Sequence, residues 1–185
     1  MHGTEADPAD RLTDVLRRAR RRPLFDRSEL RPSLDAPALV DVLPHRPPML
    51  LLDSVDGLDL AGGRAVGQRR VARDDRGFDG HFPSNPVYPG VLQVELAGQL
   101  GLYLAVCRAR HNGPTGAPPP KTRLIRVRDA SFLAEVGPDS TLTALSLLIE
   151  DDGYVLTSVA QILCGDVITC VCAFEAMLSD DQEIS

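Results

Sequence analysis

The chain has 185 residues, of which 43% are hydrophobic, and this length and composition favour one domain with a sizeable core. The formal net charge of −6 argues against a general nucleic-acid binder, which needs an excess of Lys and Arg. Because the N-terminus is polar and polar residues interrupt the most apolar stretch, we expect no signal peptide and no membrane span.

Residues 1–40 are predicted to be an N-terminal extension, partly helical or flexible. Apolar residues recur in it at helical spacing, which predicts a short amphipathic helix containing Leu12, Val15, Leu16 and Ala19. The arginine run at 17–22 lies at the C-terminal end of this helix, where cations are favoured, and prolines then break the segment. The sequence leaves open whether the extension docks on another part of the molecule or is a flexible leader.

Residues 41–179 are predicted to form the main domain, with a tail at 180–185. The apolar run at 49–55 predicts a strand, and a turn at 61–63 leads to a second strand ending near Arg73. A nearly uniform apolar stretch at 91–107 predicts a buried helix of about four turns. After a loop at 112–120, strands are predicted at 122–132, 141–149, 154–164 and 167–177, with turns at 151–153 and 165–166. This pattern indicates an α+β domain in which an antiparallel sheet of about six strands wraps round one helix.

The cysteines lie inside apolar runs and lack metal-ligand spacing with any His: Cys107, Cys164, Cys170 and Cys172. A buried Cys behaves as a small hydrophobic residue. We therefore interpret them as reduced core residues of a cytoplasmic protein.

The stretch Gly80–Gln99, GHFPSNPVYPGVLQVELAGQ, concentrates the chemistry of the chain. His81 lies among prolines and glycines that fix an irregular backbone, and Glu95 and Gln99 share one face of the predicted helix. An apolar environment disfavours a charged carboxyl group, so Glu95 is a candidate general acid and His81 a candidate general base. The helix start at Gly90 would offer unpaired N–H groups to an oxyanion. A lone His or a buried Glu is also often structural, and the spacing alone leaves both interpretations open.

The pattern GHFPxxPVxPGVLxxExxxQ resembles the signature of the beta-hydroxyacyl-[acyl-carrier-protein] dehydratases of the hot-dog fold, specifically the FabZ type. A second segment, LPHRPPMLLLD at 43–53, resembles the motif that precedes this signature in the same family. The resemblance covers roughly Asp41–Met177 and implies the hot-dog fold. We favour structural roles for His45 and Arg46, and we interpret Asp53 as a strand or dimer contact.

The resemblance also implies a mechanism. His81 would remove the C2 proton of a (3R)-3-hydroxyacyl thioester, and Glu95 would protonate the departing 3-hydroxyl, giving a trans-2-enoyl thioester and water. The N–H of Gly90 would hold the thioester carbonyl oxygen, and Tyr88, which is larger than the family's usual residue, would narrow the tunnel mouth. Substrate-binding positions are expected at Gly90, Phe82, Tyr88 and Gln99.

The family implies partners as well. Substrate would arrive on the phosphopantetheine arm of an acyl carrier protein, in fatty-acid or polyketide-type biosynthesis, with no metal or redox cofactor. Protomers would pair as a homodimer, or as a higher homo-oligomer of dimers, with each site taking its His from one protomer and its Glu from the other. Basic residues cluster at 17–22, 64–73 and 121–128. These clusters would either steer the acidic carrier protein to the site or be ordinary solvent-exposed faces, and the sequence leaves both interpretations open.

Two alternatives stay open. A hot-dog acyl thioesterase would use an acidic residue on the same helix, but the intact GHFP segment argues against it. A non-catalytic subunit of a hot-dog heterodimer is the other, and it is weakened because the chain retains both His81 and Glu95.

Overall fold

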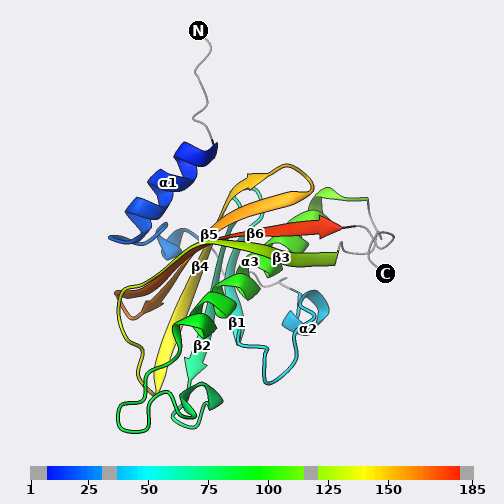
Figure 1. Ribbon diagram of the computed structural model, residues 1–185. Helices are drawn as coiled ribbons and strands as arrows, with labels where there is room; N and C mark the ends of the chain where they lie inside the picture. The colour runs from blue at the N-terminus through cyan, green and yellow to red at the C-terminus, as the bar shows by residue number, and fades with distance from the viewer. Residues whose placement is uncertain (1–7, 31–36, 115–120, 180–185) are drawn as a thin grey trace.

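A six-stranded antiparallel sheet and one long helix form the body of the molecule (Figure 1). The structure is a computed structural model that describes residues 8–30, 37–114 and 121–179. The strand order is β1-β2-β4-β5-β6-β3. The strands are β1 (Ser54–Asp59), β2 (Arg64–Val71), β3 (Lys121–Phe132), β4 (Ser140–Asp151), β5 (Val155–Cys164) and β6 (Val167–Ser179). The last four agree closely with the predicted strands, and the turns between β4, β5 and β6 lie where expected.

Helix α3 (Gly90–Asn112) fills the concave side of this sheet. Its apolar residues on several faces are buried against the sheet, and Leu96, Leu100, Tyr103 and Leu104 are at most 1% exposed. The sheet approaches closely at Gly101, where an added methyl group would overlap the Phe174 ring. The helix is longer than the predicted 91–107, and the arrangement confirms the predicted hot-dog fold. Among the described helices, only α3 is long and apolar enough to cross a membrane, and here it is the core helix.

The strand predicted at 49–55 is wrong over most of its length, because β1 begins only at Ser54. Residues before it cross the surface of α3 instead of joining the sheet. The backbone N–H groups of Leu51 and Leu52 donate to Oε1 of Gln99, at 2.9 and 3.2 Å. A helix side chain thus replaces the neighbouring strand as their hydrogen-bond acceptor.

Helix α1 (Pro8–Ala19) confirms the predicted amphipathic helix and packs on the outer face of the sheet. Val15 and Ala19 are buried there against side chains of β4, β5 and β6. Gln161 of β5 is fully buried beneath it; its Nε2 donates to the carbonyls of Ala19 and Arg22, and its Oε1 accepts from the N–H of Leu24. Helix α1 and the residues that follow it are therefore packed on the outer face of the sheet.

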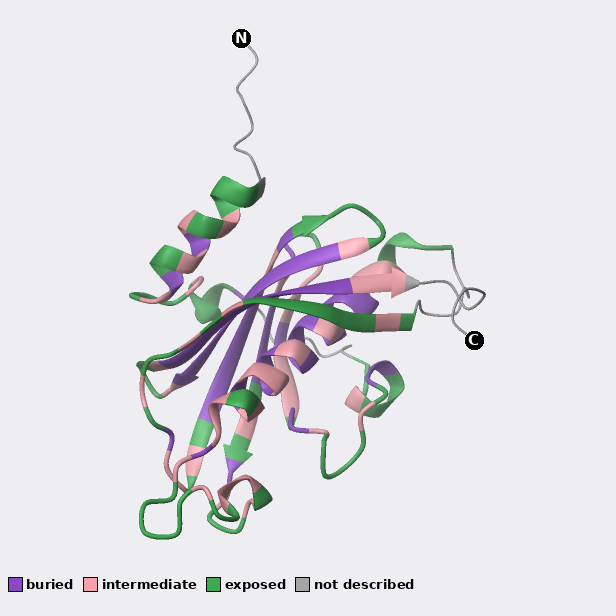
Figure 2. Cartoon of the chain, viewed as in Figure 1, coloured by how far each residue is buried: buried purple, intermediate pink, exposed green. Residues whose placement is uncertain are grey.

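Shorter elements complete the described chain: η1 (Arg27–Glu29), α2 (Leu39–Val42) and η2 (Arg76–Phe78). Of the cysteines, Cys107, Cys170 and Cys172 are buried, Cys164 is half-buried, and all four are free thiols. Strand β3 forms one edge of the sheet and is exposed along most of its length, whereas β5 is largely buried (Figure 2).

Candidate active site

The loop between η2 and α3 holds His81 by backbone contacts. The Nδ1 atom of His81 lies 2.7 Å from the carbonyl oxygen of Val87, and the backbone N–H of Val87 donates to the carbonyl of His81. A carbonyl oxygen can only accept, so Nδ1 carries the proton and Nε2 keeps a free lone pair. The ring also stacks on Phe82, with ring centroids 4.2 Å apart. His81 is thus held in the tautomer that a general base acting through Nε2 requires.

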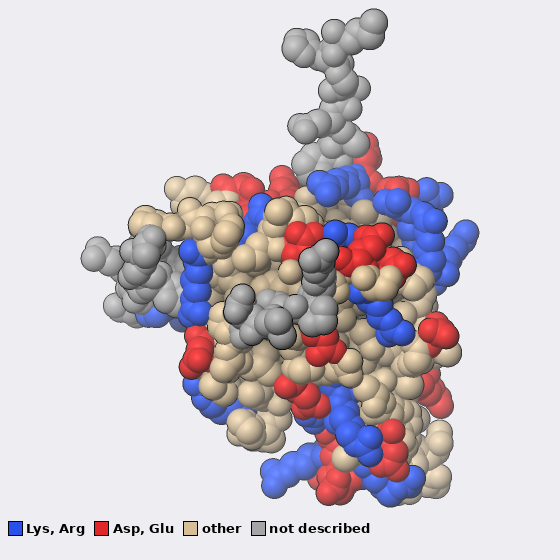
Figure 3. Space-filling view, turned by 180° about the vertical axis from the view of Figure 1, so that it is seen from behind, with Lys and Arg blue, Asp and Glu red and all other residues tan. Residues whose placement is uncertain are grey.

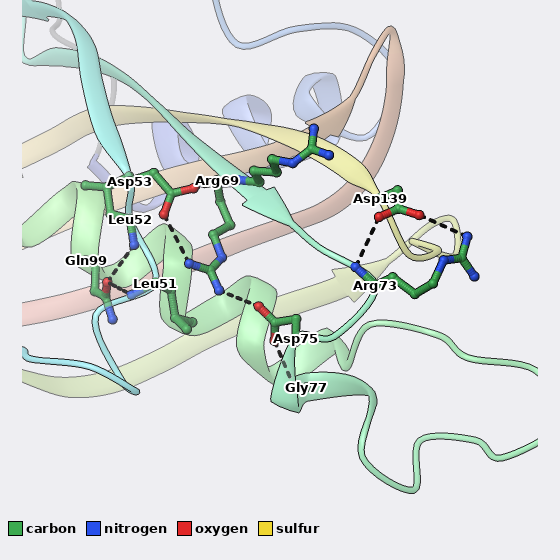
Figure 4. A network of polar contacts seen from close by, with 10 residues as sticks. Leu51, Leu52, Asp53, Arg69, Arg73, Asp75, Gly77, Gln99 and Asp139 are labelled. Carbon is green, nitrogen blue, oxygen red and sulfur yellow. Dashed lines mark hydrogen bonds and ion pairs between the residues drawn. The ribbon is translucent and has the colours of Figure 1, made fainter.

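A partly buried ion-pair network ties this loop to the sheet (Figure 4). Arg69 of β2 binds Asp53 at 3.1 Å and also pairs with Asp75, which accepts from the N–H of Gly77 at the start of η2. Asp53 in addition accepts from the N–H of Arg70 at 2.7 Å. Through Arg69, the contacts of Asp53 connect the second motif to the histidine loop.

Tyr88 lies in the core of the chain, 1% exposed, rather than at a surface opening. Its ring meets Phe78 edge-on at 5.8 Å, and Gly77 makes room for it, since a methyl group there would lie 2.7 Å from the ring. Burial raises the pKa of Tyr88 to about 12. Tyr88, which is larger than the family's usual residue at this position, thus fits because Gly77 has no side chain.

Gly90 and Phe82, two further predicted substrate contacts, lie at the surface near the start of α3. Phe82 is 52% exposed, beyond its contact with His81. Gly90 lies directly under the Phe132 ring, where a methyl group would be 2.6 Å from a ring carbon. The Pro89 carbonyl accepts from the N–H groups of Leu92 and Gln93, and the N–H of Gly90 lies before this first turn, where a helix offers no acceptor of its own.

Glu95 lies in a small cavity of about 170 Å³ between α3, the 43–53 segment and the edge of the sheet. Its Oε1 atom accepts from Nε2 of Gln99 at 2.8 Å and lies 3.3 Å from Nε2 of His45. The Glu95 side chain is 30% exposed, so the apolar environment expected from the sequence is only partly realised. The other lining residues include Pro44, Gly98, Leu102, Leu124 and Phe174.

His81 is not among the residues that line this cavity. A single chain therefore places the candidate base and the candidate acid in separate surroundings. A larger cavity of about 720 Å³ lies between the α1 segment and the outer face of the sheet, and neither His81 nor Glu95 lines it. We take the small cavity as the candidate site because it contains the predicted acid.

Gln99 is buried, 1% exposed, and its amide is fully engaged within the chain. Its Oε1 accepts from two backbone N–H groups, and its Nε2 donates to the Met49 carbonyl at 2.6 Å and to Glu95. An amide has two acceptor and two donor positions, so none remains for a substrate. The structure places Gln99 as a support for Glu95.

Comparison with known proteins identifies the family. The FabA-like domain family model matches residues 43–170. The chain belongs to the FabA-like family. The 3-hydroxyacyl-[acyl-carrier-protein] dehydratase FabZ of Clostridium acetobutylicum is 36% identical over 110 residues, which are 60% of this chain and 73% of that protein. The FabZ of Ligilactobacillus salivarius is 43% identical over 82 residues, 44% of this chain and 58% of that protein. The resemblance to FabZ-type dehydratases is thereby confirmed.

Solved structures agree on the fold of this FabA-like chain. The dehydratase heterocomplex ApeI:P from Xenorhabdus doucetiae superposes with a TM-score of 0.63 at 19% identity, covering 78% of this chain and 93% of that chain. The Escherichia coli PaaI protein from the phenylacetic acid degradation operon gives a TM-score of 0.54 at 14% identity, covering 69% and 79%. At these identities the two structures support the hot-dog fold and nothing further.

Sequence reasoning missed two features of the FabA-like site. The contact between His45 and Glu95, which are 50 residues apart in the sequence, joins the two motifs, and only the joint presence of the motifs hinted at it. In the sequence, only a cluster of arginines hinted at the ion pairs that Arg69 forms. Among the described residues, no group of His, Cys, Asp and Glu is arranged to hold a metal ion.

Proposed function

We propose that this chain is a dehydratase that removes water from (3R)-3-hydroxyacyl-[acyl-carrier-protein] thioesters, giving trans-2-enoyl thioesters in fatty-acid or polyketide-type biosynthesis. The observation that carries the proposal is the match to FabZ dehydratases in a chain that retains both His81 and Glu95. The held tautomer of His81 and the cavity beside Glu95 support it.

In this mechanism Nε2 of His81 takes the proton from C2 of the substrate. The electron pair of that C–H bond forms the C2=C3 double bond, the bond from C3 to the hydroxyl oxygen breaks, and Glu95 supplies the proton that lets the hydroxyl leave as water. The imidazolium and the carboxylate then return to their starting states by proton exchange with solvent. A positioned acid and base of this kind each contribute about 10²- to 10⁴-fold to a rate.

The start of α3 supplies the oxyanion site. The N–H of Gly90 would hold the thioester carbonyl oxygen, on which negative charge develops when the C2 proton leaves. The positive end of the helix dipole favours charge at this point. Glycine is required because the Phe132 ring occupies the space of a side chain.

A homodimer would bring the acid and the base together. The separation of His81 from the Glu95 cavity within one chain supports a site completed by a second copy. Strand β3 supports such pairing, because it is an exposed sheet edge with exposed apolar side chains at Leu124, Ile125 and Val127.

Subunit complementation tests the shared site. In a mixed dimer of a His81→Ala chain and a Glu95→Gln chain, one site loses both residues and the other keeps both. Random mixing should therefore restore about one quarter of wild-type activity if each site spans two protomers. If both residues act within one chain, every site is defective and mixing restores nothing.

We also propose that the substrate is delivered by an acyl carrier protein in the cytoplasm. The basic clusters are largely neutralised, since Arg64, Arg69 and Arg73 all form ion pairs within the chain. Acidic and basic side chains are correspondingly intermixed over much of the face in Figure 3. Within the described residues, Arg70 and Arg76 are exposed and have no ion-pair partner, and Arg76 lies in η2 shortly before His81, so we assign carrier steering to these two arginines. Steering predicts a KM that rises with salt.

The decisive experiment is mass spectrometry of purified protein incubated with a panel of 3-hydroxyacyl carrier-protein thioesters. Loss of one water supports the dehydratase, and the chain-length profile indicates the substrate. Release of free acid would instead support a thioesterase, and no reaction would favour the non-catalytic subunit. His81→Ala and Glu95→Gln should each abolish most dehydration without unfolding the protein.

A further inference from the structure

The second motif reaches the candidate acid directly. His45 and Glu95 line the same cavity, and Nε2 of His45 lies 3.3 Å from Oε1 of Glu95. Both side chains are mostly shielded, at 25% and 30% exposure. The Nδ1 atom of His45 is buried and has no hydrogen-bond partner in the described part of the chain.

These contacts fix the tautomer of His45. Oε1 of Glu95 already accepts from the Gln99 amide, so Nε2 of His45 faces an acceptor atom and is the ring nitrogen that carries a hydrogen. Nε2 of His45 therefore faces Glu95, while Nδ1 faces the buried side, where the described residues offer no hydrogen-bond partner.

Gln99 has only one possible orientation beside the same carboxyl group. Its Oε1 is occupied by the N–H groups of Leu51 and Leu52, so its NH₂ group must face Glu95 and the Met49 carbonyl. Oε1 of Glu95 thus accepts from Nε2 of Gln99 at 2.8 Å and lies 3.3 Å from Nε2 of His45. The other carboxyl oxygen, Oε2, is left to carry the proton.

The backbone around His45 is held rigidly by Arg46. Its guanidinium group donates to the carbonyls of Leu43 at 2.9 Å, His45 at 2.7 Å and Val40 at 3.1 Å. These bonds tie the loop to the end of α2, and Leu43 is 1% exposed in the core. Arg46 is structural, as the sequence suggested, and its structural role is to present His45.

We infer that His45 is a positioning residue for the dehydration: with Gln99 it fixes Oε1 of Glu95, so that Oε2 delivers the proton to the 3-hydroxyl of the substrate. This inference rests on the proposed function. It assigns His45 a role beyond the structural one that the sequence favoured.

Two substitutions separate positioning from packing. His45→Phe keeps an aromatic ring and removes the donor, whereas His45→Gln keeps an N–H donor of similar reach. Loss of this polar contact with Glu95 should lower kcat roughly 10- to 100-fold in His45→Phe. The KM should stay within about threefold, because His45 acts on Glu95 rather than on the substrate. His45→Gln should recover kcat to within about fivefold of wild type, and thermal unfolding should show that both variants are folded.

The outcomes are distinguishable. Unchanged kcat in His45→Phe, or an equal loss in His45→Phe and His45→Gln, overturns the positioning role while leaving the dehydratase intact. A rise in KM alone would make His45 a substrate contact and would also overturn it. An inactive wild-type enzyme in the same assay would overturn the proposed function itself, and this inference with it.

Discussion

Replacing Gln99 by Leu tests how a single helix side chain organises the site. The substitution removes the acceptor of the Leu51 and Leu52 N–H groups and the donor to the Met49 carbonyl. Gln99 is 1% exposed, so water cannot easily replace it. Each buried N–H left unsatisfied costs about 1–3 kcal/mol, and the added apolar burial offsets part of this. We expect the free energy of unfolding to fall by roughly 2–5 kcal/mol, a large share of the stability of a typical domain.

Urea unfolding followed by far-UV circular dichroism measures this loss, since the chain contains no Trp. Protein concentration must be held constant, because dimerisation would contribute to the apparent stability. Gln68→Leu is the matched control: Gln68 is exposed, and its partner Asp56 lies at the surface, so its effect should stay within about 0.5 kcal/mol. A decrease in the free energy of unfolding of less than about 1 kcal/mol in Gln99→Leu would mean that the backbone groups of residues 49–52 find other hydrogen-bond partners. Gln99 would then not be the residue that holds this segment in place.

Three further perturbations follow from the packing. Gly101→Ala should destabilise the folded protein by about 1–3 kcal/mol, because the added methyl group would overlap Phe174. Gly98→Ala on the same helix meets no atom within 4 Å and should stabilise the protein slightly. Equal effects of the two substitutions in urea unfolding would contradict this. Gln161→Leu should release the α1 segment from the sheet, because it removes the hydrogen bonds at the end of α1. Amide hydrogen exchange should then become faster in α1 and stay unchanged in β5. Unchanged protection of α1 would show that its apolar contacts alone hold it on the sheet. The pKa of Tyr88 is about 12 in the folded chain and ~10 in the unfolded chain. The contribution of Tyr88 to the free energy of unfolding is therefore complete below pH 10 and is lost as the pH rises toward 12, by up to about 1.4 kcal/mol per pH unit. An identical alkaline loss of stability in Tyr88→Phe would refute this.

Local patterns determined most of the secondary structure. Alternation and turn residues predicted β3 to β6 with small errors at their ends, because the residues that decide a strand and its turns are neighbours in sequence. The uniform apolar stretch predicted α3 as the buried helix, and the spacing of Glu95 and Gln99 placed both on one face. The two motifs together indicated the family and the candidate catalytic pair.

Contacts between distant residues decided the rest. The 49–53 run is as apolar as a strand, but the N–H groups of Leu51 and Leu52 are satisfied by Gln99, almost 50 residues away. The extension docks because Gln161 accepts and donates hydrogen bonds at the end of α1, more than 130 residues away. His45 has no local feature that distinguishes it from a structural histidine; only the fold brings it to Glu95. Hydrogen-bond partners chosen across the fold leave no periodic signal in the sequence, so they could be found only in the tertiary structure.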